Sequence, residues 1–408
     1  MEEEKNYQYK SKEEYSKINK EIVSNLQAEH EQKQNYIYYT VNLQYYNYYQ
    51  MYYIVIPKQY LNQIKILRKR KEDIFAKGKI LTFSSRNSKF HFDAVVDFTE
   101  DIYSYIVPIK EKYRYSKDQT GEYVVNERNG DLTFDRMDQA IDTFNEGECC
   151  SENLEKYILG QDISNDNINN KKFYNLFNYK RYFKTSIHNF ANLKKNQVSQ
   201  IKNIFYNEMN TIQLKSNSDQ KIICLIINAI YQMRKNITDK ILICSSSNLA
   251  ADSIALDLLD MNKYITKLNI LRIYAKNQEL IKRNKKLYQI SYHKLLRKKF
   301  KKKKFNDRNE KKEWIINRSD IIISTCVNSY CDEIINYEFP FVIIVDADNS
   351  NENENLIPLT LKSKHAVLIS YDWNQSDQYN LYQRMKYIYP QNHIDLYNLY
   401  NKNRDDHL

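Results

Sequence analysis

Glycine is scarce in this sequence and unevenly placed. Only five of the 408 residues are glycine, and all five lie within the first 160 residues. Loops that wrap a phosphate depend on glycine, because it lets backbone N–H groups approach the ligand closely and adopts backbone angles that other residues avoid. The remaining 248 residues therefore lack glycine, the residue on which phosphate-binding loops usually depend.

Long hydrophobic runs and metal-binding cysteine patterns are also missing. No stretch approaches the roughly 18 apolar residues of a membrane helix, and the amino terminus MEEEKN has no apolar signal region. The six cysteines include the adjacent pair Cys149 and Cys150 but no pair separated by two residues, which disfavours a structural zinc site. We expect buried or reduced thiols, no bound metal, no membrane association and a cytoplasmic location, with the nucleus as the alternative.

Positive charge is concentrated in one segment. Residues 282–305 contain 12 Lys or Arg and no acid, so removing them takes the net charge from +11 to −1. A solvated lysine run and a nuclear-import signal are both compatible with this pattern. Contact with a polyanion such as RNA is favoured, because so many like charges repel one another until a partner neutralises them.

The first 160 residues predict helices around a small β domain. Residues 1–34 have helix-forming composition with apolar residues at helical spacing, and helical spacing returns at 131–160. Between them, residues 35–130 contain short β-rich runs separated by polar turns, which is typical of a small barrel. The tyrosine-dense run YIYYTVNLQYYNYYQMYY is either a stacking platform for bases or ordinary strand surface, and the second interpretation is favoured.

Residues 161–390 predict an α/β domain. Its strands are continuous apolar runs that alternate with helices, which indicates a parallel sheet covered on both faces. A helical insertion is expected at 276–316 and a carboxyl-terminal tail at 391–408.

Four stretches in order resemble the first motor domain of the up-frameshift superfamily-1 RNA helicases of nonsense-mediated decay. They are LKKNQVSQI, ILICSSSNLAADSI, SDIIISTCVNS and FVIIVDADNSNENENLIPLTLKSKHAVLIS, and LTFDRMDQAIDTF and KYILGQDI extend the resemblance upstream. The resemblance implies a RecA-like, P-loop NTPase-type domain with a β-barrel insertion on helical stalks and a basic helical insertion. It also implies that the family's zinc domain and second RecA-like domain are missing, so we expect a degenerate family member truncated after the first RecA-like domain.

The position that matches the family's phosphate loop reads Leu214 to Lys221, LKSNSDQK. Here Gln220 takes the place of the lysine that neutralises phosphate, and Lys221 takes the place of the hydroxyl that binds magnesium. Gln197 matches the family's adenine-contacting glutamine, although a surface glutamine is the simpler interpretation. We expect these residues to be vestiges of a nucleotide site.

The next motif reads VDAD. Asp346 matches the family's magnesium-side carboxylate, whereas Ala347 replaces the glutamate that activates water. Asp348 is expected to continue the strand and therefore to point to the face opposite that of residue 347. We therefore expect no catalytic residue and no cofactor; ATP and magnesium are expected only if the chain is an active helicase.

RNA contacts in this family are mainly to the backbone, and matching residue types persist here. Asn248 is expected to cap the helix that begins LAAD, although helix caps and loop residues explain the same pattern. The expected RNA-binding residues are Ser246, Ser247, Asn248, Ser324, Thr325, Lys298, Lys299, Lys301, Lys302, Lys303 and Lys304.

The resemblance and the lost residues together favour an inactive relative of these helicases that acts as an RNA-binding or complex-assembly module. Its expected partners are single-stranded RNA and proteins of RNA decay or processing. Two alternatives stay open: an active ATP-dependent RNA helicase and a pure protein-interaction scaffold.

Overall fold

The computed structural model describes most of the chain in segments. These are residues 8–33, 39–46, 51–57, 60, 75, 80–85, 91–100, 103–108, 120–127, 131–163, 201, 203–214, 220–262, 268–275, 278–279, 284–298, 300, 304–305, 307–371 and 380–396. The chain divides into two compact units. One comprises residues 1–24, 135–274 and 284–408, and the other comprises residues 25–134 and 275–283.

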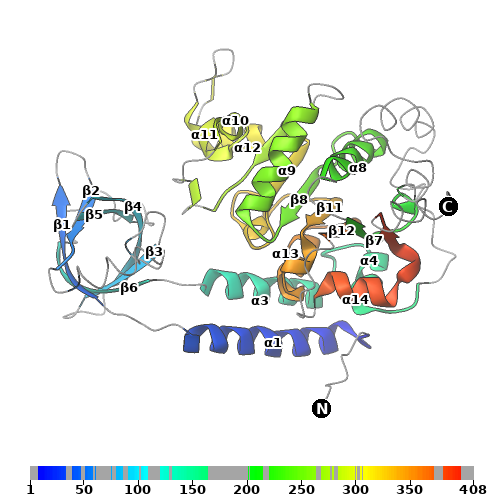
Figure 1. Ribbon diagram of the computed structural model, residues 1–408, viewed down its shortest axis with the longest axis horizontal. Coiled ribbons are helices and arrows are strands. Elements are labelled where there is room, and N and C mark those ends of the chain that lie inside the picture. The colour runs from blue at the N-terminus through cyan, green and yellow to red at the C-terminus, as the bar shows by residue number, and fades with distance from the viewer. Residues whose placement is uncertain are drawn as a thin grey trace, which may run out of the picture. The chain divides into compact units, whose positions relative to one another are not determined.

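The smaller unit contains a closed antiparallel barrel (Figure 1). Alternating residues point inward, and Tyr39, Leu43, Tyr52 and Phe83 are completely buried in its core. The barrel closes in the order β1-β2-β5-β4-β3-β6, and its strands are β1 (Tyr39–Tyr46), β2 (Met51–Val55), β3 (Ile80–Ser85), β4 (His91–Glu100), β5 (Tyr103–Pro108) and β6 (Gly121–Glu127). The predicted small barrel is present.

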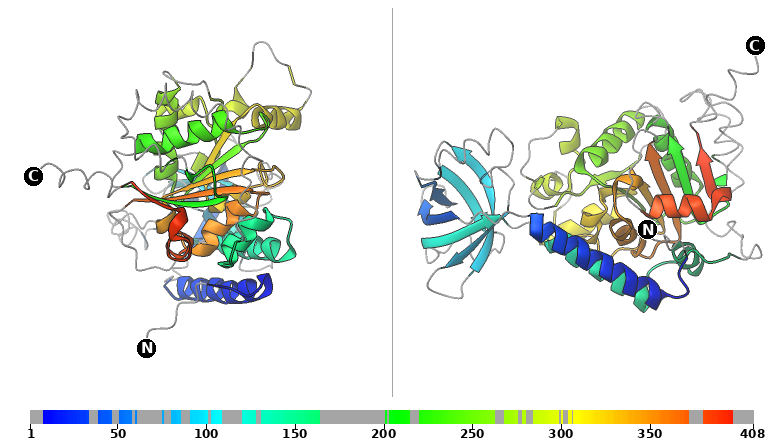
Figure 2. Two further views of the ribbon diagram at one scale, coloured as in Figure 1. Left: turned by 90° about the vertical axis from the view of Figure 1, so that its right-hand side faces the viewer. Right: turned by 60° about the horizontal axis from the view of Figure 1, so that its bottom comes forward.

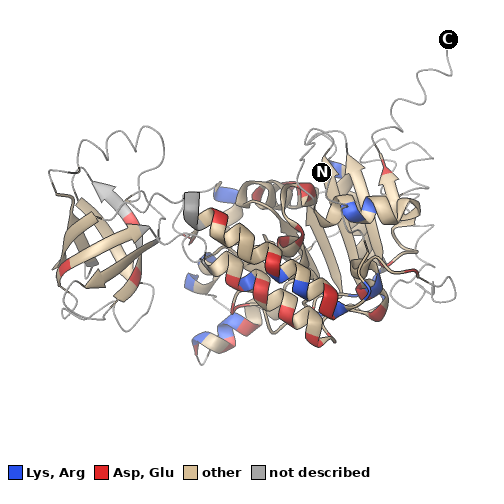
Figure 3. Cartoon of the chain, turned by 90° about the horizontal axis from the view of Figure 1, so that it is seen from below, with Lys and Arg blue, Asp and Glu red and all other residues tan. Residues whose placement is uncertain are grey.

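Tyrosines of the dense run occupy both sides of the barrel wall. Tyr52 is buried, whereas the next residue, Tyr53, faces outward and its hydroxyl donates to the side chain of Gln44. The described part of the run therefore lies in amphipathic strands, in agreement with the favoured interpretation, and base stacking on the outward tyrosines is not tested. The described strands of the barrel, β1 to β6, carry acidic residues but no Lys or Arg (Figure 3).

The larger unit is built on a parallel sheet of seven strands in the order β13-β7-β12-β11-β8-β10-β9. The strands are β7 (Met209–Leu214), β8 (Ile241–Ser245), β9 (Ile270–Arg272), β10 (Ile321–Thr325), β11 (Phe341–Val345), β12 (His365–Tyr371) and β13 (His393–Asp395). Nearly every residue of the central strands is buried, which explains why their sequences are continuous apolar runs.

Helices cover both faces of this sheet (Figure 2). On one face lie α8 (Gln220–Met233) and α9 (Asn248–Met261); on the other lie α13 (Glu352–Leu359) and α14 (Leu381–Ile388). The predicted α/β architecture is therefore correct. The predicted end of this domain at residue 390 is too early, because β13 pairs with β7 and extends the sheet to Asp395.

Further helices lie outside these layers. They are α1 (Lys12–Lys33), α3 (Asp131–Glu146), α4 (Glu152–Leu159) and, within the predicted insertion, α10 (Lys285–Tyr288), α11 (Tyr292–Arg297) and α12 (Arg308–Asn317). Short 3-10 turns occur at η9 (Val327–Tyr330), η10 (Ala347–Asn349) and η11 (Pro390–Asn392). Within the described residues, no helix has the length and apolarity needed to cross a membrane.

A buried ion pair joins several of these helices. Arg384 of α14 is completely buried and contacts both carboxylate oxygens of Glu352 on α13, at 2.6 and 3.1 Å. Its guanidinium also donates to the carbonyl of Ile158 on α4 at 2.6 Å and lies over the ring of Tyr9, 5.2 Å from its centroid. Charges buried this deeply are tolerated only when such partners satisfy them.

Candidate nucleotide and nucleic-acid sites

Several predicted site residues meet at the carboxyl edge of the sheet. Because all seven strands are parallel, β7, β8, β10, β11 and β12 end at the same edge. In α/β sheets this edge is where ligands bind, between the strand ends and the helices that follow. Strand β12 separates β7, which precedes the phosphate-loop position, from β11, which precedes Asp346.

Asp346 ends β11 in a left-handed backbone conformation, with φ at 64°. Ser246, which follows β8, donates its hydroxyl to Oδ2 at 3.1 Å, and Asn349 donates its side-chain amide to Oδ1 at 2.6 Å. Both carboxylate oxygens are thus engaged by side chains of this chain. Ser246, which was predicted as an RNA contact, lies beside the carboxylate predicted to face magnesium, and its contact with RNA stays a prediction.

The left-handed turn at Asp346 also overturns the expected position of Asp348. The strand stops at Val345 and residues 347–349 form η10, so Asp348 does not continue a strand. Its side chain is only 3% exposed and lies beside Ser370 at the end of β12. Burial raises the pKa of Asp348 to about 6, while a hydrogen bond with Ser370 opposes the rise and the charge of Asp346 adds to it.

Ala347 is completely buried and brings no polar group to this edge. Its carbonyl oxygen accepts a hydrogen bond from the Asn355 side chain on α13, at 2.8 Å. The position adjacent to Asp346 is therefore a packing position.

Most of the predicted phosphate-loop residues lie outside the described part of the chain, as does Gln197. Gln220 begins α8, but its side chain is not among those described. Lys221 is exposed in the first turn of α8. Their expected role as nucleotide contacts stays a prediction.

The start of α9 differs from expectation. Ser247, rather than Asn248, is the N-cap: its hydroxyl accepts a hydrogen bond from the backbone N–H of Ala250 at 3.1 Å. Asn248 already lies in the helix, where its side-chain oxygen accepts from Arg272 at 2.8 Å. The cap falls one residue earlier because Ser247 has the extended backbone that an N-cap requires.

Arg272 was not singled out from the sequence. It is completely buried at the end of β9, donates to Asp252 of α9 at 2.9 Å, and lies 4.1 Å from the centroid of the Tyr274 ring. The Tyr274 hydroxyl donates to the same carboxylate oxygen of Asp252 at 2.8 Å. No local pattern predicts this cluster, because its members come together only when β9 packs beside α9.

The strand β10 offers less to RNA than expected. Ser324 is completely buried, and its hydroxyl accepts from the Asn328 side chain at 3.1 Å, so the predicted RNA contact through Ser324 is wrong. Thr325, the last residue of the strand, is partly exposed. Only Thr325 of this predicted pair reaches the surface.

The lysine-rich insertion has a small aromatic cluster at its base. The rings of Phe300, Phe305 and Trp314 pack edge to face, with centroids 5.0 to 5.9 Å apart. The ammonium of Lys311 on α12 lies over the Phe300 ring, 5.4 Å from its centroid. It donates to the carbonyls of Leu296 and Lys298, at 2.6 and 2.8 Å.

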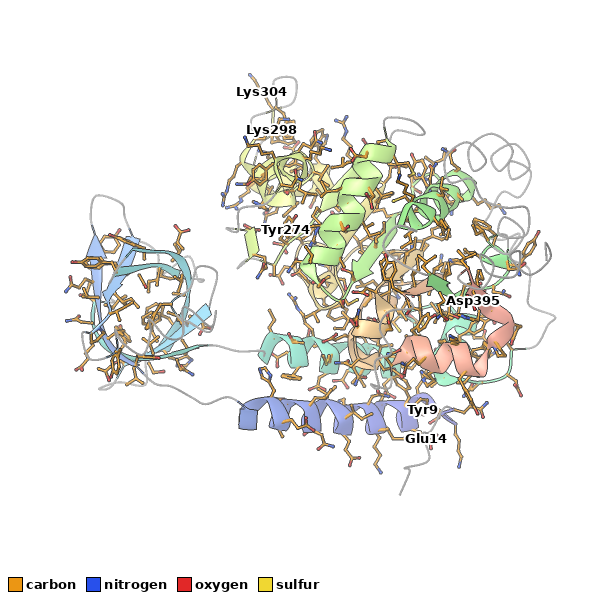
Figure 4. All side chains as sticks on the ribbon, in the orientation of Figure 1. Tyr9, Glu14, Tyr274, Lys298, Lys304 and Asp395 are labelled. Carbon is orange, nitrogen blue, oxygen red and sulfur yellow. The ribbon has the colours of Figure 1, made fainter. Side chains whose placement is uncertain are left out.

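Two rings of the aromatic cluster lie next to the two ends of the lysine run, which is residues 301–304. Phe300 and Phe305 flank residues 301–304, and their ring centroids are 5.9 Å apart. Lys298 and Lys304 are exposed at this end of the insertion, where Figure 4 labels both. Four further lysines predicted to bind RNA lie outside the described residues: Lys299, Lys301, Lys302 and Lys303.

Metal-binding groups are not evident in the described residues, where no three His, Cys, Asp or Glu side chains are arranged to hold an ion.

Comparisons with known proteins bear on the α/β unit. A family model described as an AAA domain matches residues 192–313 and 278–370. The ATP-dependent helicase NAM7 of Saccharomyces cerevisiae is 26% identical over an alignment of 262 residues that covers 58% of this chain and 25% of that protein. The regulator of nonsense transcripts 1 homolog of Arabidopsis thaliana is 25% identical over 260 residues, 58% of this chain and 20% of that protein.

The parallel sheet and the AAA domain match place the larger unit in the P-loop class of α/β domains, in agreement with a RecA-like fold. The chain is a relative of the up-frameshift superfamily-1 helicases. It spans about a quarter or less of the length of these two relatives.

Proposed function

We propose that this protein is a catalytically inactive up-frameshift-type helicase relative that binds the backbone of single-stranded RNA and helps to assemble RNA-decay or RNA-processing complexes. It requires neither ATP nor magnesium for this role. We place it in the cytoplasm, with the nucleus as the alternative.

The observation that carries the proposal is Ala347. Phosphoryl transfer to water needs a group that orients and activates the water, and the residue after Asp346 is a buried methyl group. Removing one such group typically costs about 3 kcal/mol or more of transition-state stabilisation. The absence of glycine between Leu214 and Lys221 removes a second requirement, the converging backbone N–H groups.

Support for RNA binding comes from the basic insertion. Phe300 and Phe305, which flank the lysine run in sequence, both pack against Trp314, and Lys298 and Lys304 beside them are exposed. A phosphate backbone neutralises such a cluster and releases counterions, which gives affinity without sequence preference.

Titration of single-stranded RNA at several salt concentrations tests this function. A variant with Ser at Lys298, Lys299 and Lys301 to Lys304 should bind more weakly, and the slope of log affinity against log salt should fall by about 0.7 for each phosphate that the variant no longer neutralises. A matched pair of double variants sharpens the comparison: Lys298→Ser with Lys304→Ser, against Lys17→Ser with Lys235→Ser, exposed lysines elsewhere. Equal affinity in the two pairs would remove the insertion from the RNA site.

Phosphate release distinguishes the proposal from an active helicase. We expect no RNA-stimulated release of phosphate from ATP. RNA-stimulated release that disappears in Asp346→Ala would replace the inactive assignment with ATP-dependent helicase activity. Absence of RNA binding, together with partner capture that survives nuclease treatment, would instead assign the chain as a protein scaffold.

A further inference from the structure

The adjacent thiols of Cys149 and Cys150 form a group that the RNA function does not use. They lie between α3 and α4, just before Ser151, whose hydroxyl caps α4. Their sulfur atoms are 3.9 Å apart, and all six cysteines of the chain are free thiols.

The backbone around this pair is held tightly. Gly147 and Glu148 both adopt positive φ angles, of 87° and 60°, and reverse the chain after α3. Cys150 then forms a parallel β-bridge with Ser363, and the N–H of Ser151 donates to the Ser363 carbonyl at 2.8 Å. This bridge ties the chain between α3 and α4 to the turn before β12.

The contact between the two thiols favours ionisation of one sulfur over the other. The pKa of Cys149 is lowered, chiefly because the neighbouring Cys150 thiol hydrogen-bonds to its sulfur, and the ammonium of Lys12 adds to the lowering while burial and Glu155 oppose it. The pKa of Cys150 is raised well above its usual range, first by the same hydrogen bond. The pair therefore loses one proton readily and holds the second, as closely coupled groups do.

Lys12 is held beside the pair by its own contacts. Its ammonium lies 3.3 Å from Glu155 of α4, and it approaches so near to Gly147 that a Cβ there would lie 3.1 Å from Nζ. Glycine at 147 thus permits both the left-handed turn and the close approach of this cation.

The other cysteines differ in access and ionisation. Burial raises the pKa of Cys331 to about 12 and raises the pKa of Cys224 further, and both side chains are buried. Cys150 is partly exposed, so a small reagent can reach the pair. Reactivity of a thiol follows its thiolate population and its exposure. In this pair the sulfur with the lowered pKa, that of Cys149, lies 3.9 Å from the sulfur of the partly exposed Cys150, whereas the four other cysteines are buried.

We propose that Cys149 and Cys150 form a reactive dithiol that peroxide oxidises to a disulfide between neighbouring residues. One sulfur, as thiolate, attacks the O–O bond of hydrogen peroxide and becomes a sulfenic acid, and the displaced hydroxide takes a proton and leaves as water. The second sulfur then attacks the sulfenic sulfur, the S–O bond breaks, the S–S bond forms, and the second water leaves with the remaining thiol proton. Two thiols lose two electrons in total, and one peroxide becomes two waters.

Forming the disulfide requires the two sulfur atoms to move from 3.9 Å apart to a bonding distance of about 2.0 Å, so the backbone of Cys149 and Cys150 must shift. Cys150 is bridged to Ser363, and the N–H of the next residue, Ser151, donates to the Ser363 carbonyl. The proposal therefore also expects this hydrogen bond to weaken on oxidation.

Peroxide treatment of the full chain, followed by peptide mapping, tests the proposal. The peptide containing both cysteines should lose the mass of two hydrogens, recover it on reduction with dithiothreitol, and react first. With iodoacetamide at neutral pH it should label more than about tenfold faster than the four other cysteines, since the thiolate is the reactive form. Hydrogen exchange at Ser151 should rise in the oxidised protein.

Serine variants separate the pair from single thiols. Phenylarsine oxide, which bridges two neighbouring thiols, should bind once to the wild-type chain and not to Cys149→Ser or Cys150→Ser. Cys331→Ser is the matched control and should bind as the wild type does. If a serine variant fails to fold, peptide mapping of the peroxide-treated wild-type chain decides whether the disulfide forms between Cys149 and Cys150. A disulfide mapped to other cysteines, or oxidation of the pair no faster than the rest, would overturn the proposal.

Discussion

Ser246 and Asp346 are separated by 100 residues in sequence, yet the Ser246 hydroxyl donates to the Asp346 carboxylate at 3.1 Å. The contact joins the ends of β8 and β11, which are neighbours in the sheet with Val345 opposite Ser245. With Asn349 on its other oxygen, Asp346 is held by side chains of its own chain. Replacing Ser246 should remove this donor from Oδ2 of Asp346, and it would not supply the water-activating group that is missing at Ala347.

We expect Asp348→Asn to stabilise the protein near neutral pH. The folded-state pKa of Asp348 is raised to about 6 by burial, so the folded state binds this proton more tightly than the unfolded state. The wild-type carboxyl therefore costs stability as pH rises from about 4 to 6, and the full cost persists above pH 6.

The stability gain at pH 7.5 should be about 1 to 3 kcal/mol, and it should vanish near pH 4. Urea denaturation of both proteins across this pH range measures the difference. Asn349→Asp is unsuitable as a control because it adds a charge beside Asp346; Glu338→Gln, at an exposed position of the same unit, is suitable. A gain that does not depend on pH would contradict the assignment of the raised pKa.

Two histidines, His365 which is completely buried and His393 which is partly buried, should make the fold sensitive to acid. Burial lowers the pKa of His365 and of His393 to about 4 in each case. Because the unfolded imidazole has a pKa near 6.5, stability is fully present above about pH 6.5 and is lost as pH falls toward 4.

For His365, which is completely buried, the loss should approach about 3 kcal/mol. His365→Gln keeps a donor for the Ile204 carbonyl, which the histidine Nε2 contacts at 2.8 Å, and cannot be protonated. It should therefore flatten the fall in melting temperature between pH 6.5 and 4. An unchanged pH profile would show that His365 is not the titrating group. Asp348 acts in the opposite direction in this range, so the comparison is made between variants rather than from the wild type alone.

Arg384→Met should destabilise the larger unit strongly. It leaves the carboxylate of Glu352 buried without its cation, and breaking one side of such a pair costs about 3 to 5 kcal/mol. Combining it with Glu352→Met should recover most of that loss, because no uncompensated charge remains. Denaturant midpoints of the two single variants and the double variant form the cycle. A double variant as unstable as the sum of the singles would show that the charges do not act as a pair.

Trp314→Ala should weaken RNA binding although it changes no charge. Removing this ring takes away the partner that Phe300 and Phe305 share, so the ends of the lysine run lose their anchor. We expect a several-fold loss of affinity and a smaller salt slope, measured by fluorescence anisotropy. Tyr206→Ala, at an exposed aromatic elsewhere in the same unit, should leave both unchanged. If Trp314→Ala bound RNA as the wild type does, the cluster would have only a structural role.

Repeating patterns allowed the architecture to be predicted from sequence. The apolar runs of β8, β10, β11 and β12 predicted a two-sided parallel sheet, and short β-rich runs separated by polar turns predicted the barrel. Short edge strands were missed: β9 and β13 contain three residues each, too few for a periodic signal. At the site, residue types were readable but their directions were not, as Asp348, Ser324 and the cap at Ser247 show.

By itself, the sequence determined which chemical groups exist: a chain without glycine after residue 160, alanine beside Asp346, and one dense group of lysines. Those facts hold whatever the fold. Only the tertiary structure decided which groups meet, because a single left-handed residue at Asp346 turned Asp348 into the protein interior, and strand pairing brought Ser246 to Asp346. Backbone turns and contacts between distant strands depend on the packing of the whole domain, and no local pattern of residues specifies them.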